Sequence, residues 1–334
     1  MDKKNNVRLY KYDNIKFFLI VLVAIGHVCE PFVEKSFVMK SIFLYIYIFH
    51  MPLFIFISGL FQKSYSDGRE FNRNRALSFI LLGYVCKIVK FVMERAVYGL
   101  DTSFHLLSED GIPWFMFVLA ACMSIMYLCR NIKPVYLLSI AVLLACFAGY
   151  DESIGDFLCL SRIVVYFPFY AIGYYLDPKQ LADFVKNKYI KILSVLVLIF
   201  VLYLCTAKLD VFYQTRHLWT GRNPFNQWDL QHSGFLLRGG CYILTSLVGI
   251  SILSLIPNCK IPYITENGKH TIRVYFWHIF ILKFLYYYGF ENILFEMGVT
   301  GKIILLVIPI LLCFLLSTRF FGFPADYILE KSYK

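Results

Sequence analysis

The sequence predicts an all-α, polytopic integral membrane protein of about ten transmembrane helices, and three observations support this class. First, 59% of the 334 residues are hydrophobic and only 16% are charged, whereas soluble domains average roughly 25% charged residues. Second, apolar runs recur that are long enough to cross about 30 Å of hydrocarbon as helices. Third, lysines and arginines concentrate in alternate connections, as basic residues do in cytoplasmic loops.

The apolar runs are the expected transmembrane helices. They cover residues 15–33, 39–62, 76–97, 113–129, 134–149, 161–176, 190–206, 234–256, 271–290 and 302–320. The distribution of basic residues predicts that both termini are cytoplasmic, which an even number of spans allows. We therefore expect one membrane domain over residues 1–334, with short cytoplasmic tails at 1–14 and 321–334 and no appended soluble domain.

Charge and cysteine content exclude several function classes. The net charge of +11 would suggest nucleic acid in a soluble domain, but here topology and anionic membrane lipids account for the basic excess. The ten cysteines lie mostly inside the apolar runs and form no C-x-x-C pair. Neither a disulfide framework nor a metal site is indicated, and we expect no nucleic-acid partner.

Two histidines inside apolar runs are the first candidates for function. His27 lies in KFFLIVLVAIGHV and His50 in YIYIFHMPLFIFISGLF. An imidazole in hydrocarbon loses hydration that apolar neighbours cannot replace, so an intramembrane histidine is by default a candidate functional residue. Desolvation favours the neutral imidazole, which is the state that a general base needs.

Spacing predicts that the first span joins a cation to His27 along one face. Lys16 and His27 are eleven residues apart, which is three helical turns, or about 16 Å. His50 should lie about 18 Å from the end of its helix at Gln62, close to the depth of His27. Pro52 cannot donate to the carbonyl of Ile48, so the second span should kink beside His50 and leave that carbonyl free.

Several sequence blocks resemble the membrane-bound acyltransferase family 3, and within it the branch related to fucose 4-O-acetylases. YDNIKFFLIVLVAIGHV resembles the opening motif, with Asp13, Lys16 and His27 in place. FHMPLFIFISGLF is the most distinctive block and contains His50, Pro52, Ser58 and Gly59. Weaker similarity continues through FNRNRALSFILLGYV, GIPWFMFVLAAC, YFPFYAIGYYL and HTIRVYFWHIFIL, the last containing Tyr275 and His278.

The resemblance implies transfer of an acyl group, usually acetyl from acetyl-CoA, to a hydroxyl of a cell-surface or lipid-linked sugar. It implies a catalytic role for His27, which acts as general base or transient acyl carrier. Lys16 and His50 are the other expected catalytic residues. An enzyme of this kind would modify envelope polysaccharide from a bacterial cytoplasmic membrane, and its partners would be acyl-CoA, the glycan acceptor and membrane lipids.

Further roles follow for residues near these motifs. The polyanionic donor should bind cations on the cytoplasmic side, and the candidates are Lys16, Arg73 and Arg75. Glu30 is placed to orient His27 at i+3, although it can equally cap the helix. The remaining supporting candidates are Asp13, Ser58 and His278, and Ser58 or His50 is expected to stabilise an oxyanion.

The outward loop 207–233 has features of a sugar-binding surface, carried by Trp219, Trp228 and Arg222. Aromatic residues also line membrane interfaces for structural reasons, so both interpretations stay open. A transporter or flippase for a lipid-linked oligosaccharide is the alternative function class, because buried histidines and a kinked helix would also serve transport. A polysaccharide polymerase would require a larger arginine-rich loop than this chain has.

Overall fold

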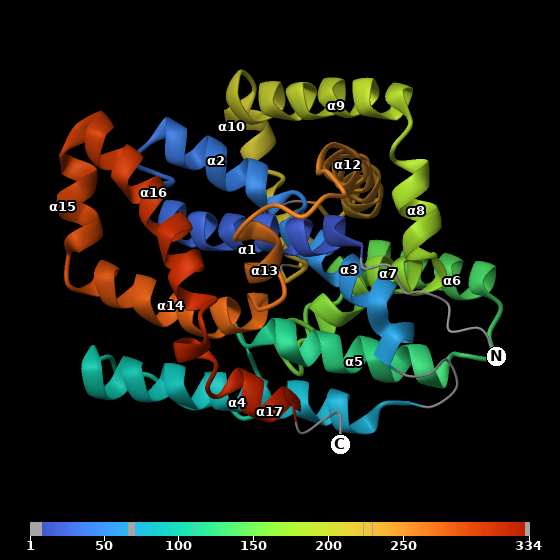
Figure 1. The fold of residues 1–334 in the computed structure, drawn as a ribbon, viewed down its shortest axis with the longest axis horizontal. Helices are drawn as coiled ribbons and strands as arrows, with labels where there is room; N and C mark the ends of the chain where they lie inside the picture. Colours follow the sequence, from blue (N-terminus) through green and yellow to red (C-terminus); the bar gives the residue numbers. More distant parts are fainter. Residues whose placement is uncertain (1–8, 66–70, 110, 223, 229, 331–334) are drawn as a thin grey trace.

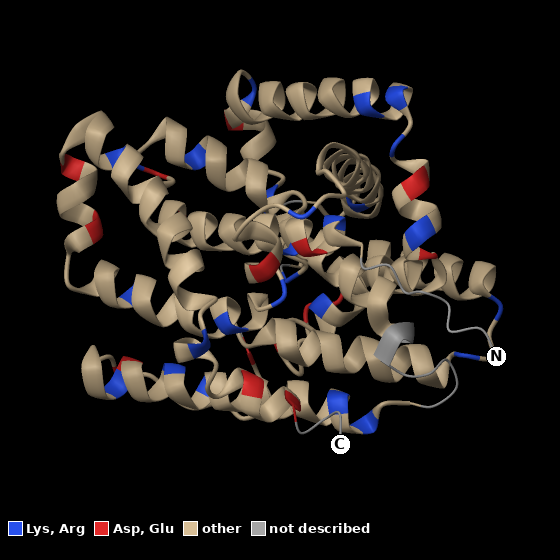
Figure 2. Cartoon of the chain, viewed as in Figure 1, with Lys and Arg blue, Asp and Glu red and all other residues tan. Residues whose placement is uncertain are grey.

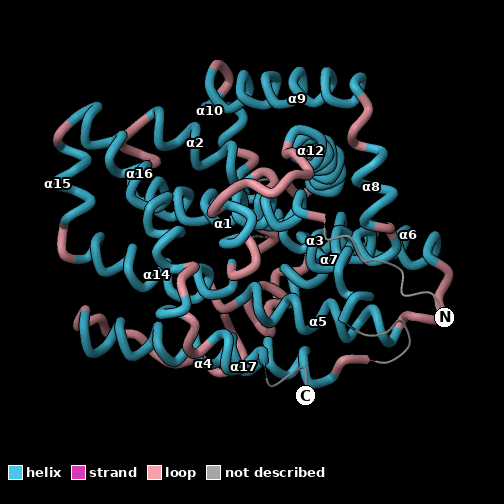
Figure 3. The backbone as a smooth tube through the Cα atoms, in the orientation of Figure 1, coloured by secondary structure: helices cyan, strands magenta, loops and turns pink. Residues whose placement is uncertain are grey.

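The computed structural model describes residues 9–65, 71–109, 111–222, 224–228 and 230–330, and side chains are not described at 63–65, 227 and 228. The described residues form a bundle of helices joined by short loops, and no strand occurs among them (Figures 1 and 3). The predicted all-α class is therefore confirmed.

Each of the ten apolar runs is helical in the structure. The corresponding helices are α1 (Tyr10–Cys29), α2 (Phe37–Tyr47) followed by α3 (His50–Tyr65), α4 (Arg73–Val92), α5 (Trp114–Leu128), α6 (Pro134–Phe147), α7 (Leu160–Tyr175), α9 (Lys188–Thr206), α12 (Gly234–Leu255), α14 (Thr271–Tyr287) and α16 (Gly298–Leu316). Shorter helices connect them: α8 (Pro178–Phe184), α10 (Leu209–Tyr213), α11 (Arg216–Trp219), α13 (Ile264–Asn267), α15 (Phe290–Glu296) and α17 (Ala325–Glu330).

Among the described residues, six helical segments are long and apolar enough to cross a membrane. They are Tyr10–Phe32, Phe37–Gln62, Arg73–Val97, Lys188–Thr206, Gly234–Leu255 and Gly298–Leu316. Trp114–Leu128 and Pro134–Tyr150 are shorter apolar helices. The chain is thus an integral membrane protein, while ten crossings and two cytoplasmic termini stay predictions.

Polar residues define where several of these helices begin. The Ser36 side chain accepts a hydrogen bond from the backbone N–H of Met39 at the start of α2, and Asn72 does the same for Arg75 at the start of α4. Asp177 accepts from two backbone N–H groups at the start of α8. These side chains satisfy backbone donors that have no partner within the helix.

The break between α2 and α3 confirms the kink expected beside His50. α2 ends at Tyr47 and α3 begins at His50. The carbonyl of Ile48, which Pro52 cannot reach with a hydrogen bond, accepts one from the Thr245 hydroxyl of α12 at 2.7 Å. A neighbouring helix therefore satisfies the polar group that the proline releases in an apolar environment.

Helices α3 and α7 pack closely because each presents a glycine to the other. A Cβ atom at Gly59 would lie 2.1 Å from the carbonyl oxygen of Tyr170, and one at Gly173 would lie 2.1 Å from that of Phe56. Small residues permit this close approach of membrane helices. Gly59 belongs to the most distinctive sequence block, so packing explains its presence there.

Helix α1 lies near the middle of the bundle, between α2, α14, α16 and α12 (Figure 1). Asn14 fixes its N-terminal end: the side chain donates to the carbonyls of Pro257 and Cys259 and accepts from the Thr265 hydroxyl. By contrast, α9 lies at the periphery of the bundle (Figure 1). Most charged residues lie near the ends of helices (Figure 2). The functional candidates on α1 are therefore held in the interior.

Candidate active site

Two cavities open at opposite ends of the same helices. One, of about 570 Å³, is lined by His27, His50 and His278 and is called the imidazole cavity. The other, of about 1070 Å³, is lined by Lys16 and Arg75 among others and is called the basic cavity. The first and last turns of α1 line different cavities, and the same holds for α4, α7 and α14.

The two cavities meet at a shared wall formed by Val23, Met51 and Tyr275, which line both of them. These residues come from α1, α3 and α14. The Tyr275 hydroxyl donates to the carbonyl of Ile112 and thereby ties α14 to the segment before α5. Side chains from these three helices therefore lie between the two cavities.

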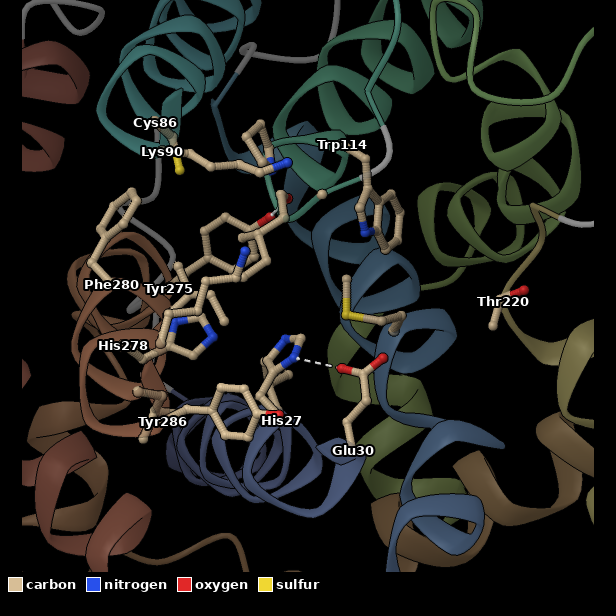
Figure 4. Close-up of a pocket in the computed structure, with 18 of the residues that line it drawn as sticks. His27, Glu30, Cys86, Lys90, Trp114, Thr220, Tyr275, His278, Phe280 and Tyr286 are labelled. Atoms are coloured by element: carbon tan, nitrogen blue, oxygen red, sulfur yellow. Dashed lines mark hydrogen bonds and ion pairs between the residues drawn. The ribbon is translucent and has the colours of Figure 1, made fainter. Parts of the chain in front are cut away.

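His27 and Glu30 form a pair at the end of α1. The His27 Nδ1 lies 3.4 Å from the Glu30 carboxylate, and the two residues project into the imidazole cavity (Figure 4). An ionised carboxylate only accepts hydrogen bonds, so it favours a proton on Nδ1. The lone pair of a neutral His27 then resides on Nε2.

His278 and His50 each have one ring nitrogen committed to the backbone. Nδ1 of His278 lies 2.8 Å from the carbonyl oxygen of Val274, and Nδ1 of His50 lies 2.8 Å from that of Ile46. Because a carbonyl only accepts, both Nδ1 atoms carry the proton and both Nε2 atoms are acceptors in the neutral ring. The His278 Nε2 is buried and has no hydrogen-bond partner in the described part of the chain.

His278 is also the closest described imidazole to His27. Their ring centroids are 5.6 Å apart, and the His278 side chain is completely buried. Figure 4 shows the two rings next to each other, with Tyr275 beside His278. The site thus brings together two acceptor nitrogens from α1 and α14, which are far apart in the sequence.

An aromatic and cationic wall completes the imidazole cavity. Trp114, at the start of α5, stacks on Tyr166 of α7 with ring centroids 5.4 Å apart. The Arg162 guanidinium lies over the Trp114 ring at 5.1 Å. The Tyr166 hydroxyl donates to the Trp219 carbonyl, which brings the outward loop to the cavity.

The basic cavity has a net positive lining. Its basic residues are Lys16, Arg75, Lys179, Lys269 and Arg273, and its acidic residues are Asp13, Asp177 and Asp326. Lys16 pairs with Asp13 at 2.9 Å, and Arg273 pairs with Asp326 at 2.8 Å. His270 lies in the same lining, and burial together with the nearby Arg273 lowers its pKa. Such a surface suits a polyanion.

The expected site residues divide between the two cavities. The imidazole cavity contains His27, Glu30, His50, His278, Trp219 and Arg222. The shared cavity of His27 and His50 agrees with their predicted similar depth. The basic cavity contains Asp13, Lys16, Ser58 and Arg75. Ser58 is therefore separated from the imidazoles, and its hydroxyl donates to the Phe54 carbonyl. Arg73 is exposed and lines neither cavity, and the Trp228 side chain lies outside the described residues.

Sequence reasoning missed Trp114, Arg162 and Met51 as parts of the site. Trp114 lies in a weakly matching block, Arg162 lies at the start of the expected span 161–176, and Met51 reads as ordinary core. One sequence signal could have indicated this side of the site. Lys87 and Lys90 lie inside an apolar run, and charged residues inside a membrane span usually face a polar cavity. Lys90 lines the imidazole cavity, and Lys87 pairs with the buried Glu109 at 3.2 Å.

Comparison with known proteins agrees with this arrangement. An acyltransferase domain family matches residues 9–318. Among curated proteins, the nodulation protein NolL of Mesorhizobium japonicum is 27% identical over 186 residues, which cover 51% of this chain and 48% of NolL. The chain thus aligns with about half the length of that relative. No solved structure matches the chain.

Proposed function

Because the chain belongs to this acyltransferase family, which matches residues 9–318, we propose that it is an O-acyltransferase that moves an acetyl group from acetyl-CoA to a sugar hydroxyl. The acceptor is a cell-surface or lipid-linked glycan. The observation that carries the proposal is the meeting of a net basic cavity with an imidazole cavity at the wall of Val23, Met51 and Tyr275.

The donor enters the basic cavity in this proposal. The phosphates of CoA contact the cations near its mouth, and Arg75 is the best placed of the arginines expected at the sequence level because it lines the cavity. Lys16 lies about 16 Å from His27 along α1, a distance of the order of an extended pantetheine arm. The thioester then reaches the shared wall while the nucleotide stays at the cytosolic end, in a bacterial cytoplasmic membrane.

The acceptor enters the imidazole cavity, and His27 acts as the general base. Its Nε2 removes the proton from the sugar hydroxyl as the oxygen attacks the thioester carbonyl. The tetrahedral intermediate collapses by breaking the carbon–sulfur bond, and the proton on His27 passes to the departing thiolate. Glu30 stabilises the imidazolium that forms between these steps, since it lies 3.4 Å from Nδ1. An acyl-imidazole on His27 is the other route that the same geometry allows.

His278 has a positioning role in this scheme. Its ring lies 5.6 Å from that of His27, and its buried Nε2 has no hydrogen-bond partner among the described residues, so in the proposal His278 holds the His27 ring in place and can accept from a hydroxyl that reaches it. His50 lines the same cavity with its Nε2 as an acceptor. Neither neutral ring donates from Nε2, so oxyanion stabilisation must come from other donors.

The test is acceptor-dependent consumption of the acetyl-CoA thioester by the purified protein. The proposal predicts that thioester loss and acetylated glycan appear in equal amounts and that neither appears without the protein. A transporter of a lipid-linked oligosaccharide would move the glycan and consume no thioester. Absence of thioester consumption with glycan extracted from cells that lack the gene would overturn the proposal.

A further inference from the structure

Arg162 is a buried cation on the wall of the imidazole cavity. It is only 5% exposed, and it lines the cavity from the first turn of α7. A buried charge is costly unless close partners compensate it. The partners of Arg162 therefore decide whether its charge is already neutralised within the chain.

Among the described residues, the one carboxylate within 4 Å of Arg162 is that of Asp156, and it is committed to another arginine. The Arg162 Nη1 lies 3.7 Å from Asp156 Oδ1, which is beyond hydrogen-bond distance. The Oδ2 of Asp156 accepts from both Nε and Nη2 of Arg222, at 2.9 and 2.5 Å. Two guanidinium groups that line the cavity thus share a single carboxylate.

The remaining contacts of Arg162 are neutral. Its Nη1 donates to the backbone carbonyl of Glu109 at 3.0 Å, and its guanidinium lies over Trp114. The Glu109 carboxylate instead forms ion pairs with two lysines. Its Oε2 lies 3.2 Å from Lys87 Nζ, and its Oε1 lies 3.8 Å from Lys90 Nζ. Counted over the described residues, the wall around Arg162 and Arg222 therefore has more cationic than anionic groups, beside the space where the proposed acceptor binds.

The aromatic part of the wall adds a second preference. Trp114 stacks on Tyr166 and lies next to the Arg162 guanidinium, and Figure 4 shows it on the side of the cavity away from His278. Because Tyr166 and Arg162 cover the Trp114 ring, Trp114 offers the cavity an apolar edge that a sugar ring can contact, while a guanidinium binds a carboxylate or phosphate with charge-assisted hydrogen bonds. One ligand that combines both features is an anionic sugar.

We propose that the acceptor is an anionic glycan, whose carboxylate or phosphate binds Arg162 while its sugar ring lies beside the edge of Trp114. This inference rests on the proposed function and specifies its acceptor. The anion compensates the buried guanidinium, and the contact fixes the sugar with its hydroxyl toward the imidazoles. A neutral sugar would leave the guanidinium of Arg162 short of a counter-charge.

The test uses glycan from cells that lack the gene, so that the natural acceptor is present without its acetyl groups. One sample is left untreated, one has its carboxyl groups reduced to alcohols, and one has its phosphate esters removed with aqueous hydrogen fluoride. Acetyl transfer from acetyl-CoA to each sample is measured with the full-length protein. Loss of a charge-assisted hydrogen bond predicts about 10- to 100-fold slower transfer to the sample that has lost its anion.

Reduced transfer after carboxyl reduction identifies a carboxylate, and reduced transfer after phosphate removal identifies a phosphate. Equal transfer to all three samples would overturn the inference but leave the acyltransferase proposal intact. No transfer to any sample, with intact thioester, would instead remove the proposed function itself. The treatments alter the glycan alone, so this comparison does not depend on any variant folding.

Arg162→Gln provides the complementary test from the protein side. We expect it to slow transfer to untreated glycan by about 10- to 100-fold and to have little effect on the treated sample that has lost the anion. Arg162→Lys retains a point charge and should restore part of the rate. Equal loss on all samples, with unchanged KM for the glycan, would assign Arg162 a structural role and contradict the inference.

Discussion

The two cavities share three helices at their common wall but differ in the chemistry that lines them. The basic cavity has five basic and three acidic residues in its lining, whereas the imidazole cavity collects three histidines, an aromatic stack and the pairs His27–Glu30 and Lys283–Glu94. The first arrangement suits binding of a polyanion, and the second suits proton transfer and recognition of a polar acceptor. In the proposed function, this contrast separates donor binding from chemistry along a single helix, α1.

The largest expected effect comes from removing the base in the imidazole cavity. His27→Gln should lower kcat for acetyl transfer by about 10²- to 10⁴-fold, the range for loss of general-base catalysis, with little change in the KM for acetyl-CoA. The measurement is acceptor-dependent thioester loss. His217→Gln, which changes a histidine outside both cavities, is the matched control. Unchanged turnover in His27→Gln would exclude His27 as the base.

A charge change in the basic cavity should affect donor binding and spare the chemical step. Arg75→Gln removes a cation from the lining, so we expect the KM for acetyl-CoA to rise about tenfold, as for loss of one hydrogen bond to a charged group, with kcat nearly unchanged. Arg73→Gln is the matched control because Arg73 is exposed and lines neither cavity. Equal effects of the two substitutions would argue against a donor site at Arg75.

Truncating a side chain of the shared wall should let water pass between the two cavities. Met51→Ala removes side-chain bulk from the wall and should admit water to the thioester, so acetyl-CoA hydrolysis without acceptor should rise several-fold. Leu53→Ala makes a similar truncation two residues away, where the side chain lines neither cavity. The readout is the ratio of thioester lost to glycan acetylated. A ratio that stays at one in Met51→Ala would contradict a separating role for this wall.

Acid should strengthen donor binding through His270. Burial and Arg273 lower the pKa of His270 in the unliganded protein, so the ring is neutral at pH 7. Phosphates bound beside it would raise its pKa, and the complex would then take up a proton. The KM for acetyl-CoA should therefore fall a few-fold as the pH drops from 7 toward 6. His270→Asn should abolish this dependence, and its persistence would assign it to another group.

The smallest effect concerns the support of the kink beside His50. Thr245→Val removes the hydrogen bond to the Ile48 carbonyl and should cost about 1 kcal/mol of stability, typical of such bonds between membrane helices. Thr245→Ser keeps the donor and is the control. Thermal unfolding in detergent measures the difference. Identical unfolding of Thr245→Val and the wild-type protein would show that the carbonyl finds another partner.

Local sequence rules predict the helices and the kink well. Apolar run length specifies helices that must satisfy their own backbone groups, and Pro52 specifies which carbonyl is released, namely that of Ile48. The rules also bring His27 and His50 to one depth. They do not identify Thr245 as the donor to Ile48, because a contact between α2 and α12 depends on how distant helices pack.

The same limit applies to the walls of the cavities. Helical spacing places Lys16 and His27 on one face of α1, but it does not show that Met51 and Tyr275 close the space between them. Arg162 lies at the edge of the apolar run 161–176, where a charge can reach the aqueous interface, and its burial follows from the packing of α7 against α5 and the segment around Glu109. Long-range packing, rather than local pattern, therefore decides which cation faces the acceptor.

The most direct test of two entrances to one reaction centre is transfer across a sealed membrane. The protein is reconstituted into vesicles with glycan trapped inside, and radiolabelled acetyl-CoA is added outside to the fraction whose basic cavity faces outward. We predict labelled glycan inside intact vesicles, with no transfer when the orientation is reversed. Labelling that requires donor and glycan on the same side of the membrane would contradict the account.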